Sequence, residues 1–524
     1  MAKPVTRRDF FNNEGLERRQ ILKYGAALGL SLALPPTGAP EAQGMPGEIT
    51  KMSASELSRA IKAREVTCVQ VMQAYLQRIH RYNPLYNAIV SLVDDAELLG
   101  QAEQADSALQ KGEYWGWMHG MPHAVKDLAD AKGLKSSYGS PIFAGTAPTE
   151  DSLHVARIRA QGAIFVGKTN TPEFGLGSHT YNTVFGTTRN AYDPNLIAGG
   201  SSGGAAVALA AQLLPVADGS DMMGSLRNPA GFNNVVGFRP SQGRVPSPSP
   251  LTNLYYEQLS TDGPMGRTVE DTIRLFHTMA GYDSRAPLSL RDTIPPYSEF
   301  RQPDFKDLKV GWMADYQGYL PTEPGVLELC ENALKKLSDR GVTVEACMPD
   351  YDMAQLWEVW LTLRHWSLSD GIPLYDNPQT RALMKPELVW EIEGSLNMPA
   401  ARVSEAGMNR SNWYRALHEL FKVYDVLALP SAQVFPFSAD IHWPKSINGK
   451  PMDTYHRWME VVVGGTLAGL PVVSMPAGLN QQGRPMGIQF MGAMGHDREV
   501  LEFAMAYESA THYLNERPTL REQL

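Results

Sequence analysis

Short apolar runs alternate with helical segments over most of this chain, and this alternation limits the fold more than any other feature. The apolar runs are rich in β-branched or aromatic residues and end at Gly or Pro, which is typical of buried strands. We expect such strands at 163–167, 308–314, 342–347, 426–430, 471–478 and 486–492. Strands that alternate with helices predict an α/β protein, with helices covering a largely buried sheet.

The expected helices begin early in the chain. Residues 52–82 carry apolar positions at helical spacing, and Ser53 or Ser55 is suited to cap the start. A second helical segment covers about 94–111. Further helices are expected at 151–161, 203–213, 268–281, 324–339, 354–369, 411–423 and 498–512. Because no low-complexity linker or internal repeat divides the chain, we expect residues 45–524 to form one domain.

The segment 345–460 is expected to be less regular than the rest. It contains seven of the ten tryptophans: Trp357, Trp360, Trp366, Trp390, Trp413, Trp443 and Trp458. Aromatic enrichment of this kind is typical of a substrate pocket, although most such side chains pack in an ordinary core.

Composition excludes several classes of partner. The formal net charge of -9 argues against nucleic acid, whose binding proteins usually carry a basic surface. The sequence has no run of about 18 apolar residues, so we expect no stable membrane span. Cys68, Cys330 and Cys347 form no CxxC pair, which indicates inert thiols and neither a metal site nor a disulfide framework. The oligomeric state, monomer or homodimer, is not decided by the sequence.

The N-terminal residues have the layout of an export signal. The pair Arg18-Arg19 and then Lys23 precede a short apolar run at 24–34, which prolines end. The twin arginine resembles a Tat signal, and Arg7-Arg8 is a weaker candidate. We therefore expect residues 1–44 to be a leader that directs the protein to the periplasm or outside the cell. The alternative is a disordered basic tail on a cytoplasmic protein.

One phosphate-loop match is expected to be accidental. "GAIFVGKT" at 162–169 fits G-x-x-x-x-G-K-T letter for letter. Its four intervening residues, Ala-Ile-Phe-Val, favour a buried strand over a turn that binds phosphate. Lys168 is therefore expected at the end of a strand.

The run GGSSGG at 199–204 allows three hypotheses. It could be a flexible linker, but a helix of strong helix formers follows directly. It also matches the nucleophile-elbow pattern G-x-S-x-G, but a turn signal, not a strand, precedes it. The third hypothesis is a close backbone approach at a helix N-terminus, where free N–H groups favour negative charge.

Two more polar residues, Ser225 and Lys126, each follow a short apolar stretch. "PVADGSDMMGSLRNPAG" at 215–231 predicts a short strand followed by a Gly/Ser turn that contains Ser225. Lys126 follows an apolar approach in "HGMPHAVKDLAD". By itself, a lysine beside Asp127 would be an ordinary surface residue.

Taken together, these stretches resemble the amidase signature family. HGMPHAVKD, GKTNTPEFG, GGSSGGAAVA, GSDMMGSLRNPA, VVGFRPSQGRVP and GPMGRTVED occur in this order, and the similarity spans about residues 52–512. The resemblance implies a large mixed, twisted central sheet covered by helices on both faces. It also implies an amidase that works without metal or cofactor.

The resemblance further assigns a Ser–Ser–Lys triad. By motif position, Ser225 is the nucleophile, Ser201 the bridging serine and Lys126 the base, and in the family a cis peptide bond holds the serine at the Ser201 position. The chemistry needs a neutral lysine, although a free lysine has a pKa of about 10.4. Burial lowers the pKa of an amine, and the apolar residues beside Lys126 are suited to provide it.

Backbone N–H groups of Met222, Met223, Gly224 and Ser225 are the implied oxyanion donors. The family has mostly Gly-Gly-Ser where this chain has Met223-Gly224-Ser225. The Met223 side chain would narrow the acyl pocket, or strain the turn if that position needs positive φ. Supporting roles are implied for Gly200, Ser202, Asp221 and Arg227, and we expect the last two to pair and brace the turn.

The implied function is hydrolysis of a small-molecule carboxylic amide through an acyl-serine intermediate. Aryl amides, peptide amides, lactams and carbamates are not separated by the sequence, and the tryptophan-rich segment favours a bulky or aromatic substrate. One alternative is the glutaminase-type subunit of an amidotransferase. Others are a carbamate or ester hydrolase on the same fold, or a non-catalytic binding protein, which Met223 alone suggests.

Overall fold

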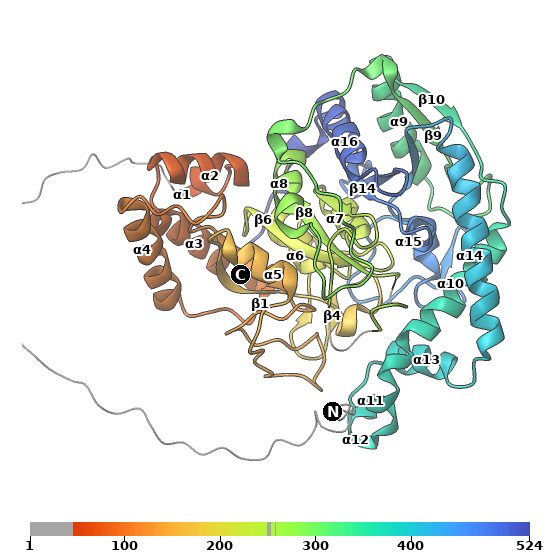
Figure 1. Cartoon of the computed structure of the whole chain (residues 1–524), viewed down its shortest axis with the longest axis horizontal. Helices are drawn as coiled ribbons and strands as arrows, with labels where there is room; N and C mark the ends of the chain where they lie inside the picture. Colours follow the sequence, from red (N-terminus) through yellow and green to blue (C-terminus); the bar gives the residue numbers. More distant parts are fainter. Residues whose placement is uncertain (1–45, 249–252, 257, 524) are drawn as a thin grey trace, which may run out of the picture. The chain divides into compact units, whose positions relative to one another are not determined.

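A mixed sheet of eight strands lies at the centre of residues 46–248, 253–256 and 258–523, the part of the chain that the computed structural model describes (Figure 1). Its strand order is β10-β9-β11-β15-β14-β7-β8-β6. β9 pairs in parallel with β10 and β11, and the other neighbours pair antiparallel. The strands are β6 (Val216–Asp221), β7 (Val236–Arg239), β8 (Thr261–Gly266), β9 (Lys309–Trp312), β10 (Thr343–Ala346), β11 (Val426–Pro430), β14 (Val472–Leu479) and β15 (Pro485–Met491).

Helices pack against this sheet. α9 (Val326–Ser338) and α16 (Asp497–Thr511) both contact β14. α7 (Arg227–Asn233) contacts β7, β14 and β15, while α8 (Val269–Met279) contacts β8. The α/β class and the large mixed sheet are thereby confirmed. No helix among the described residues combines the length and apolar character that crossing a membrane requires.

A small second sheet carries the lysine of interest. It has the strand order β1-β3-β2, with β1 (Ile89–Val90), β2 (Pro122–Lys126) and β3 (Ile164–Thr169). β2 runs parallel to β3 and contacts β6 of the large sheet. The last residue of β2, Lys126, is thus brought against the strand that leads to Ser225.

The first helical segment is divided where the sequence predicted one helix over 52–82. α2 (Ala54–Ala63) begins with a capping box of Ser53 and Glu56 and ends at Arg64, whose φ is 62°. α3 (Cys68–Tyr86) starts again from a second capping box at Thr67. The polar cap at Thr67, inside an otherwise helical pattern, is the reason for the break. The described chain begins at Pro46, so the leader expected at 1–44 lies outside the described residues.

Most later helices agree with the sequence, apart from their ends. They are α4 (Asp95–Gln110), α5 (Leu153–Ala160) and α6 (Gly203–Ala210), together with α8, α9 and α16. Strand β8 was not expected, because its sequence TDGPMG is rich in residues that disfavour strands. It lies between β6 and β7, so pairing on both sides outweighs the poor propensity. Strand β7 was missed as well.

The segment 345–460 is more regular than expected. It contains α10 (Met353–Ser367), α13 (Pro386–Ser395) and α14 (Ala400–Leu420), and α14 begins 11 residues before the helix expected at 411–423. Four of its seven tryptophans are almost fully buried: Trp357, Trp360, Trp413 and Trp458. Ordinary core packing therefore accounts for most of this aromatic enrichment.

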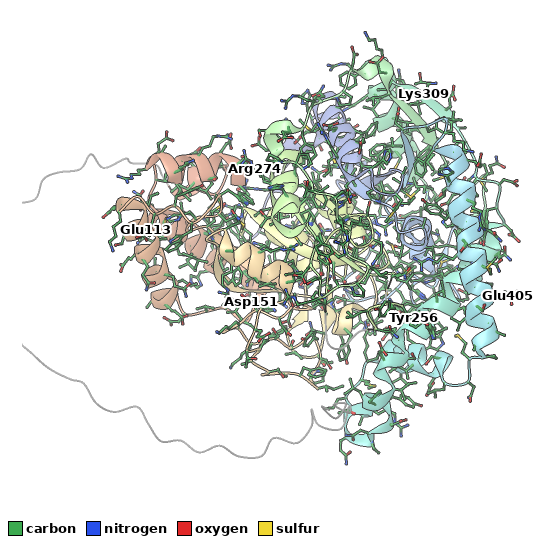
Figure 2. All side chains as sticks on the ribbon, viewed as in Figure 1. Glu113, Asp151, Tyr256, Arg274, Lys309 and Glu405 are labelled. Atoms are coloured by element: carbon green, nitrogen blue, oxygen red, sulfur yellow. The ribbon has the colours of Figure 1, made fainter. Side chains whose placement is uncertain are left out.

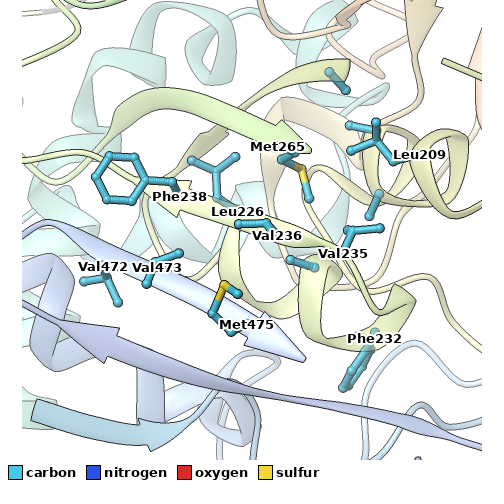
Figure 3. Close-up of a cluster of buried hydrophobic side chains, with 14 of the residues drawn as sticks. Leu209, Leu226, Phe232, Val235, Val236, Phe238, Met265, Val472, Val473 and Met475 are labelled. Carbon is cyan, nitrogen blue, oxygen red and sulfur yellow. The ribbon is translucent and has the colours of Figure 1, made fainter. Parts of the chain in front are cut away.

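The central strands share one apolar core. Figure 3 shows Val236 and Phe238 of β7, Met265 of β8, and Val473 and Met475 of β14, all of which are fully buried. Each buried side chain of this size contributes about 1.5–3 kcal/mol relative to an exposed one. The sheet next to the candidate site is therefore a firmly packed support.

Buried charges stand out against this core. Most charged side chains lie on the outside, for example Glu113, Lys309 and Glu405 (Figure 2). Lys126 and Arg227, in contrast, are enclosed. A buried charge is costly unless it is paired or neutralised, so these two side chains direct attention to their surroundings.

Candidate active site

The GGSSGG run forms a tight turn at the start of α6, not a linker. α6 is buried at every position, and the Gly200–Ser201 peptide bond is cis, as the resemblance implied. A Cβ on Gly204 would lie 2.6 Å from the Ala88 carbonyl oxygen, so only glycine allows this approach. The close backbone approach is confirmed, but the Gly204 N–H donates to the Asn170 carbonyl oxygen at 3.2 Å and is not free to bind an anion. The linker hypothesis is wrong.

Lys126 points into this turn. Its Nζ lies 2.8 Å from Ser201 Oγ, 2.8 Å from Ser202 Oγ and 2.9 Å from Ser220 Oγ. The lysine residue is 1% exposed. Ser201 and Ser202 were expected at the site from the sequence, but Ser220, the residue just before Asp221 in GSDMMGSLRNPA, was not.

Burial changes the acid–base behaviour of Lys126. Loss of hydration lowers the pKa of its amine from 10.5 to about 7, although the carboxylates of Asp262, Asp218 and Asp221 oppose this shift. A substantial fraction of the amine is therefore neutral near pH 7. A neutral amine has a lone pair that can accept a proton from a hydroxyl group at 2.8 Å.

Ser225 lies in the turn between β6 and α7, and it is 6% exposed. Its carbonyl oxygen accepts a hydrogen bond of 3.3 Å from the Ser202 N–H, which ties the two serine-bearing turns together. Among the described residues, no hydrogen bond joins the Ser201 and Ser225 hydroxyl groups directly. The structure thus brings Lys126 and Ser201 into contact and places the backbone of Ser225 beside the adjoining Ser202.

Asp221 and Arg227 brace the Ser225 turn, as the sequence suggested. Arg227 donates to Asp221 through Nε at 3.0 Å and through Nη2 at 2.9 Å, and neither side chain is exposed. Asp221 also accepts from the N–H groups of Gly224 at 2.9 Å and Leu226 at 3.1 Å. Burial by itself would raise the pKa of Asp221, but Arg227 and these hydrogen bonds lower it to about 2. The carboxylate therefore holds the turn in one shape.

This bracing corrects one expected oxyanion donor. The Gly224 N–H is engaged by Asp221, so it is not free to stabilise an oxyanion. Within the described part of the chain, the N–H groups of Met222, Met223 and Ser225 donate to no other group. Positive φ, 76°, falls at Gly224 and not at Met223. Met223 is therefore not strained, and it packs as part of the core.

Two further groups beside the site were not anticipated. Arg364 of α10 contacts the Met222 sulfur and, through Nε, lies 3.1 Å from Glu391 Oε1. His123 and Asp218 form a hydrogen bond of 2.9 Å behind Lys126. Neither group could be found from local patterns, because each joins residues that are distant in the sequence.

The phosphate-loop match proves accidental, as expected. Lys168 lies within β3, completely buried, and donates to the Ala129 carbonyl oxygen and to Ser136 Oγ. It also lies 3.7 Å from Asp127 Oδ1. These internal contacts occupy the Lys168 amine, so it is not available to bind a phosphate. No cluster of His, Cys, Asp and Glu that would suit a metal ion was found among the residues described.

The fold and the site together define a mixed α/β protein with a buried lysine–serine centre. The family model "Amidase" matches residues 70–501. The chain is 32% identical over 497 residues to a subunit of the glutamyl-tRNA(Gln) amidotransferase of Thermus thermophilus, covering 90% of this chain and 100% of that one. It is 29% identical over 471 residues to an acylamidase of Rhodococcus erythropolis, covering 89% and 97%.

A solved structure shows the same architecture. A bacterial aryl acylamidase of the amidase signature family superposes with a TM-score of 0.82 at 27% identity, covering 89% of this chain and 99% of that one. The chain therefore belongs to the amidase family, whose members include amide-hydrolysing enzymes. It is an enzyme that acts on amide C–N bonds.

Proposed function

We propose that this chain hydrolyses carboxylic amides through a covalent acyl-enzyme on Ser225, with Lys126 as the base and Ser201 as the bridge between them. The observation that carries the proposal is the enclosed Lys126 amine, 2.8 Å from Ser201 Oγ, with its pKa lowered to about 7. A serine hydroxyl is a weak nucleophile unless an adjacent base activates it. This amine is such a base.

The reaction proceeds in two halves. Lys126 takes the proton of Ser201, Ser201 takes the proton of Ser225, and Ser225 Oγ bonds to the amide carbonyl carbon. The proton then returns through Ser201 to the leaving nitrogen, the C–N bond breaks and the amine departs. Water attacks the acyl-serine by the same relay, which releases the acid and restores Ser225.

The free N–H groups of Met222, Met223 and Ser225 are the proposed oxyanion donors. They belong to a turn whose shape is fixed by Asp221, through hydrogen bonds of 2.9 Å and 3.1 Å to Gly224 and Leu226. Because these donors are already in position before the reaction, no reorganisation energy is needed when negative charge develops on the carbonyl oxygen.

The Met223 side chain is proposed to limit the acyl group. It is 7% exposed and adjoins the turn, so it occupies volume where a glycine would leave space. We expect Met223→Gly to raise kcat/KM for bulky acyl groups relative to acetyl. An unchanged ratio across an acyl series with one common amine would contradict this role.

The direct test uses a panel of anilides, peptide amides, lactams and carbamates. Ser225→Ala is expected to abolish turnover and labelling by a fluorophosphonate probe, and Lys126→Ala to lose several powers of ten in kcat/KM. Ser338→Ala, on the partly exposed end of α9, is the matched control and should retain activity. Turnover or labelling that persists in Ser225→Ala would overturn the proposal. We expect anilides to be the best substrates, since the aryl acylamidase structure is similar over most of the chain.

A glutaminase subunit is the second candidate function, favoured by the 32% identity to an amidotransferase subunit over 90% of this chain. It predicts hydrolysis of glutamine and association with partner subunits. Ammonia release from glutamine by the isolated chain, together with inactivity on the amide panel, would favour this candidate over the first.

We further propose that residues 1–44 form a twin-arginine leader and that residues 45–524 are the amidase domain. Support comes from Arg18-Arg19 ahead of the apolar run at 24–34. Fusion of residues 1–44 to a reporter should give export, and changing Arg18-Arg19 to Lys-Lys should abolish it. The same change at Arg7-Arg8 is the matched control. Retention of the unchanged fusion in the cytoplasm would contradict the proposal.

A further inference from the structure

Four titratable side chains lie behind Lys126 and take no part in the relay. His123 Nε2 lies 2.9 Å from Asp218 Oδ1, and His154 Nε2 lies 3.6 Å from Asp218 Oδ2. His154 Nδ1 lies 3.4 Å from Asp262 Oδ2. The four residues come from β2, α5, β6 and β8, so the packing of the fold, not a local motif, assembles them.

Strand pairing places Asp262 beside the lysine amine. β6 and β8 pair antiparallel with Ser220 opposite Asp262, and Ser220 Oγ lies 2.9 Å from Lys126 Nζ. Side chains directly opposite each other in an antiparallel pair share one face, with Cβ atoms about 4.5–5.5 Å apart. The Asp262 carboxylate, 18% exposed, therefore lies on the face that meets the amine.

The other charges around the amine are already matched. Asp221 on β6 is paired with Arg227, and Lys168 on β3 lies 3.7 Å from Asp127. Asp218 accepts from His123 and from the backbone N–H of Lys126 itself. Asp218 and Asp262 both pair with histidines, but only Asp262 lies opposite Ser220, whose hydroxyl group contacts the amine.

His154 lies between two carboxylates. Burial lowers the pKa of its imidazole, but Asp262 and Asp218 raise it by more, so the net direction is upward. His154 is therefore a cation over more of the neutral range than an exposed histidine. A cation beside Asp262 weakens the negative potential at the lysine.

We infer that Asp262 is a positioning residue that supplies the counter-charge for Lys126, and that His154 sets how much of this charge the lysine experiences. The inference rests on the proposed function, in which the amine is neutral before it takes the proton and a cation afterwards. A carboxylate on this face stabilises the cation and keeps the pKa of the amine from falling further under burial. His154 offsets that effect.

The experiment is the pH profile of kcat/KM on the best anilide, for the full chain and three variants. The rate falls on the acid side of this profile as Lys126 becomes protonated, so that limb reports the pKa of the amine. Asp262→Asn removes an opposite charge near the amine, which should lower this pKa and move the acid limb about 1–3 units to lower pH. Asp262→Glu keeps the charge, so its acid limb should stay close to that of the unaltered protein. His154→Gln should move it to higher pH, because the carboxylates lose their cation.

A matched control separates this effect from general damage to the core. Asp497 is also fully buried and paired, lying 3.1 Å from Arg244, but it is not among the carboxylates that act on Lys126. Asp497→Asn should reduce thermal stability and leave the limb in place. An unmoved limb in Asp262→Asn, or a shift in the same direction in His154→Gln, would overturn the inference. If Asp262→Asn does not fold, the direction of the His154→Gln shift decides.

Failure of this inference is distinct from failure of the proposed function. If Ser225→Ala and Lys126→Ala retain turnover, the assigned reaction is wrong. If both lose turnover and the Asp262→Asn limb stays where it was, only the counter-charge role is wrong.

Discussion

Replacing Lys126 with methionine is expected to change how the stability of the fold depends on pH. In the folded chain, burial lowers the pKa of this amine from 10.5 to about 7. Between those two values the unfolded chain binds more protons than the folded one, so the stability of the unaltered protein rises with pH. The energetic cost of burying the amine is fully present below about pH 7 and vanishes above 10.5. Methionine has no such cost at any pH.

The magnitude follows from the size of the shift. A pKa moved from 10.5 to about 7 corresponds to about 5 kcal/mol, at about 1.4 kcal/mol per unit. Methionine also leaves the hydroxyl groups of Ser201, Ser202 and Ser220 without their partner, a loss of about 1–3 kcal/mol each that does not depend on pH. The slope against pH, rather than the absolute difference, is therefore the informative quantity.

The assay is denaturant unfolding followed by tryptophan fluorescence at several pH values. From about pH 7.5 to about pH 9.5, the unfolding free energy of Lys126→Met minus that of the unaltered protein should fall by about 3 kcal/mol. Lys335→Met is the matched control, because that side chain is 69% exposed, and its difference should stay constant. A constant difference for Lys126→Met as well would refute the claim that burial lowers the pKa of this amine.

Two further predictions concern the Ser225 turn. Gly224→Ala forces a side chain into a backbone with φ of 76° and puts a Cβ 2.8 Å from Val462 Cγ2, so kcat should fall by up to about 100-fold as the oxyanion donors shift. If kcat stays within roughly threefold of the unaltered protein, the predicted displacement of the oxyanion donors is contradicted. Arg227→Met leaves the buried Asp221 without its main partner. The free energy of unfolding, measured by thermal unfolding, should therefore fall by about 3–5 kcal/mol. A loss of only the ~0.5 kcal/mol typical of a surface change would be the contrary result.

Sequence motifs were sufficient for the residues that form the lysine–serine contact. Lys126 and Ser201 lie far apart in the chain, and only the ordered resemblance linked them before the structure showed 2.8 Å between Nζ and Oγ. Burial of Lys126 was expected only after the resemblance made it the base, since the apolar residues beside it were suited to enclose its amine. The pairing of Asp221 with Arg227 was also expected from the resemblance, through the stretch GSDMMGSLRNPA.

The surroundings of the lysine could not be predicted, for a physical reason. Asp262 faces it only because β8 pairs with β6 in a register that sets Ser220 opposite Asp262, and the Gly/Pro-rich β8 has no strand signal of its own. Similarly, the use of the Gly224 N–H by Asp221 depends on how the turn closes. Register and turn closure depend on contacts across the fold, which local propensity does not contain.

Whether the Lys126 amine is neutral near pH 7 can be measured by an NMR titration of isotope-labelled lysine side chains, with Lys126→Ala used to assign the resonance. The Lys126 signal should be present in the unaltered protein, be missing in the variant, and titrate with a pKa of about 7. A Lys126 signal that titrates near the ordinary lysine value of 10.5 would mean that the amine is charged at neutral pH and cannot serve as the base.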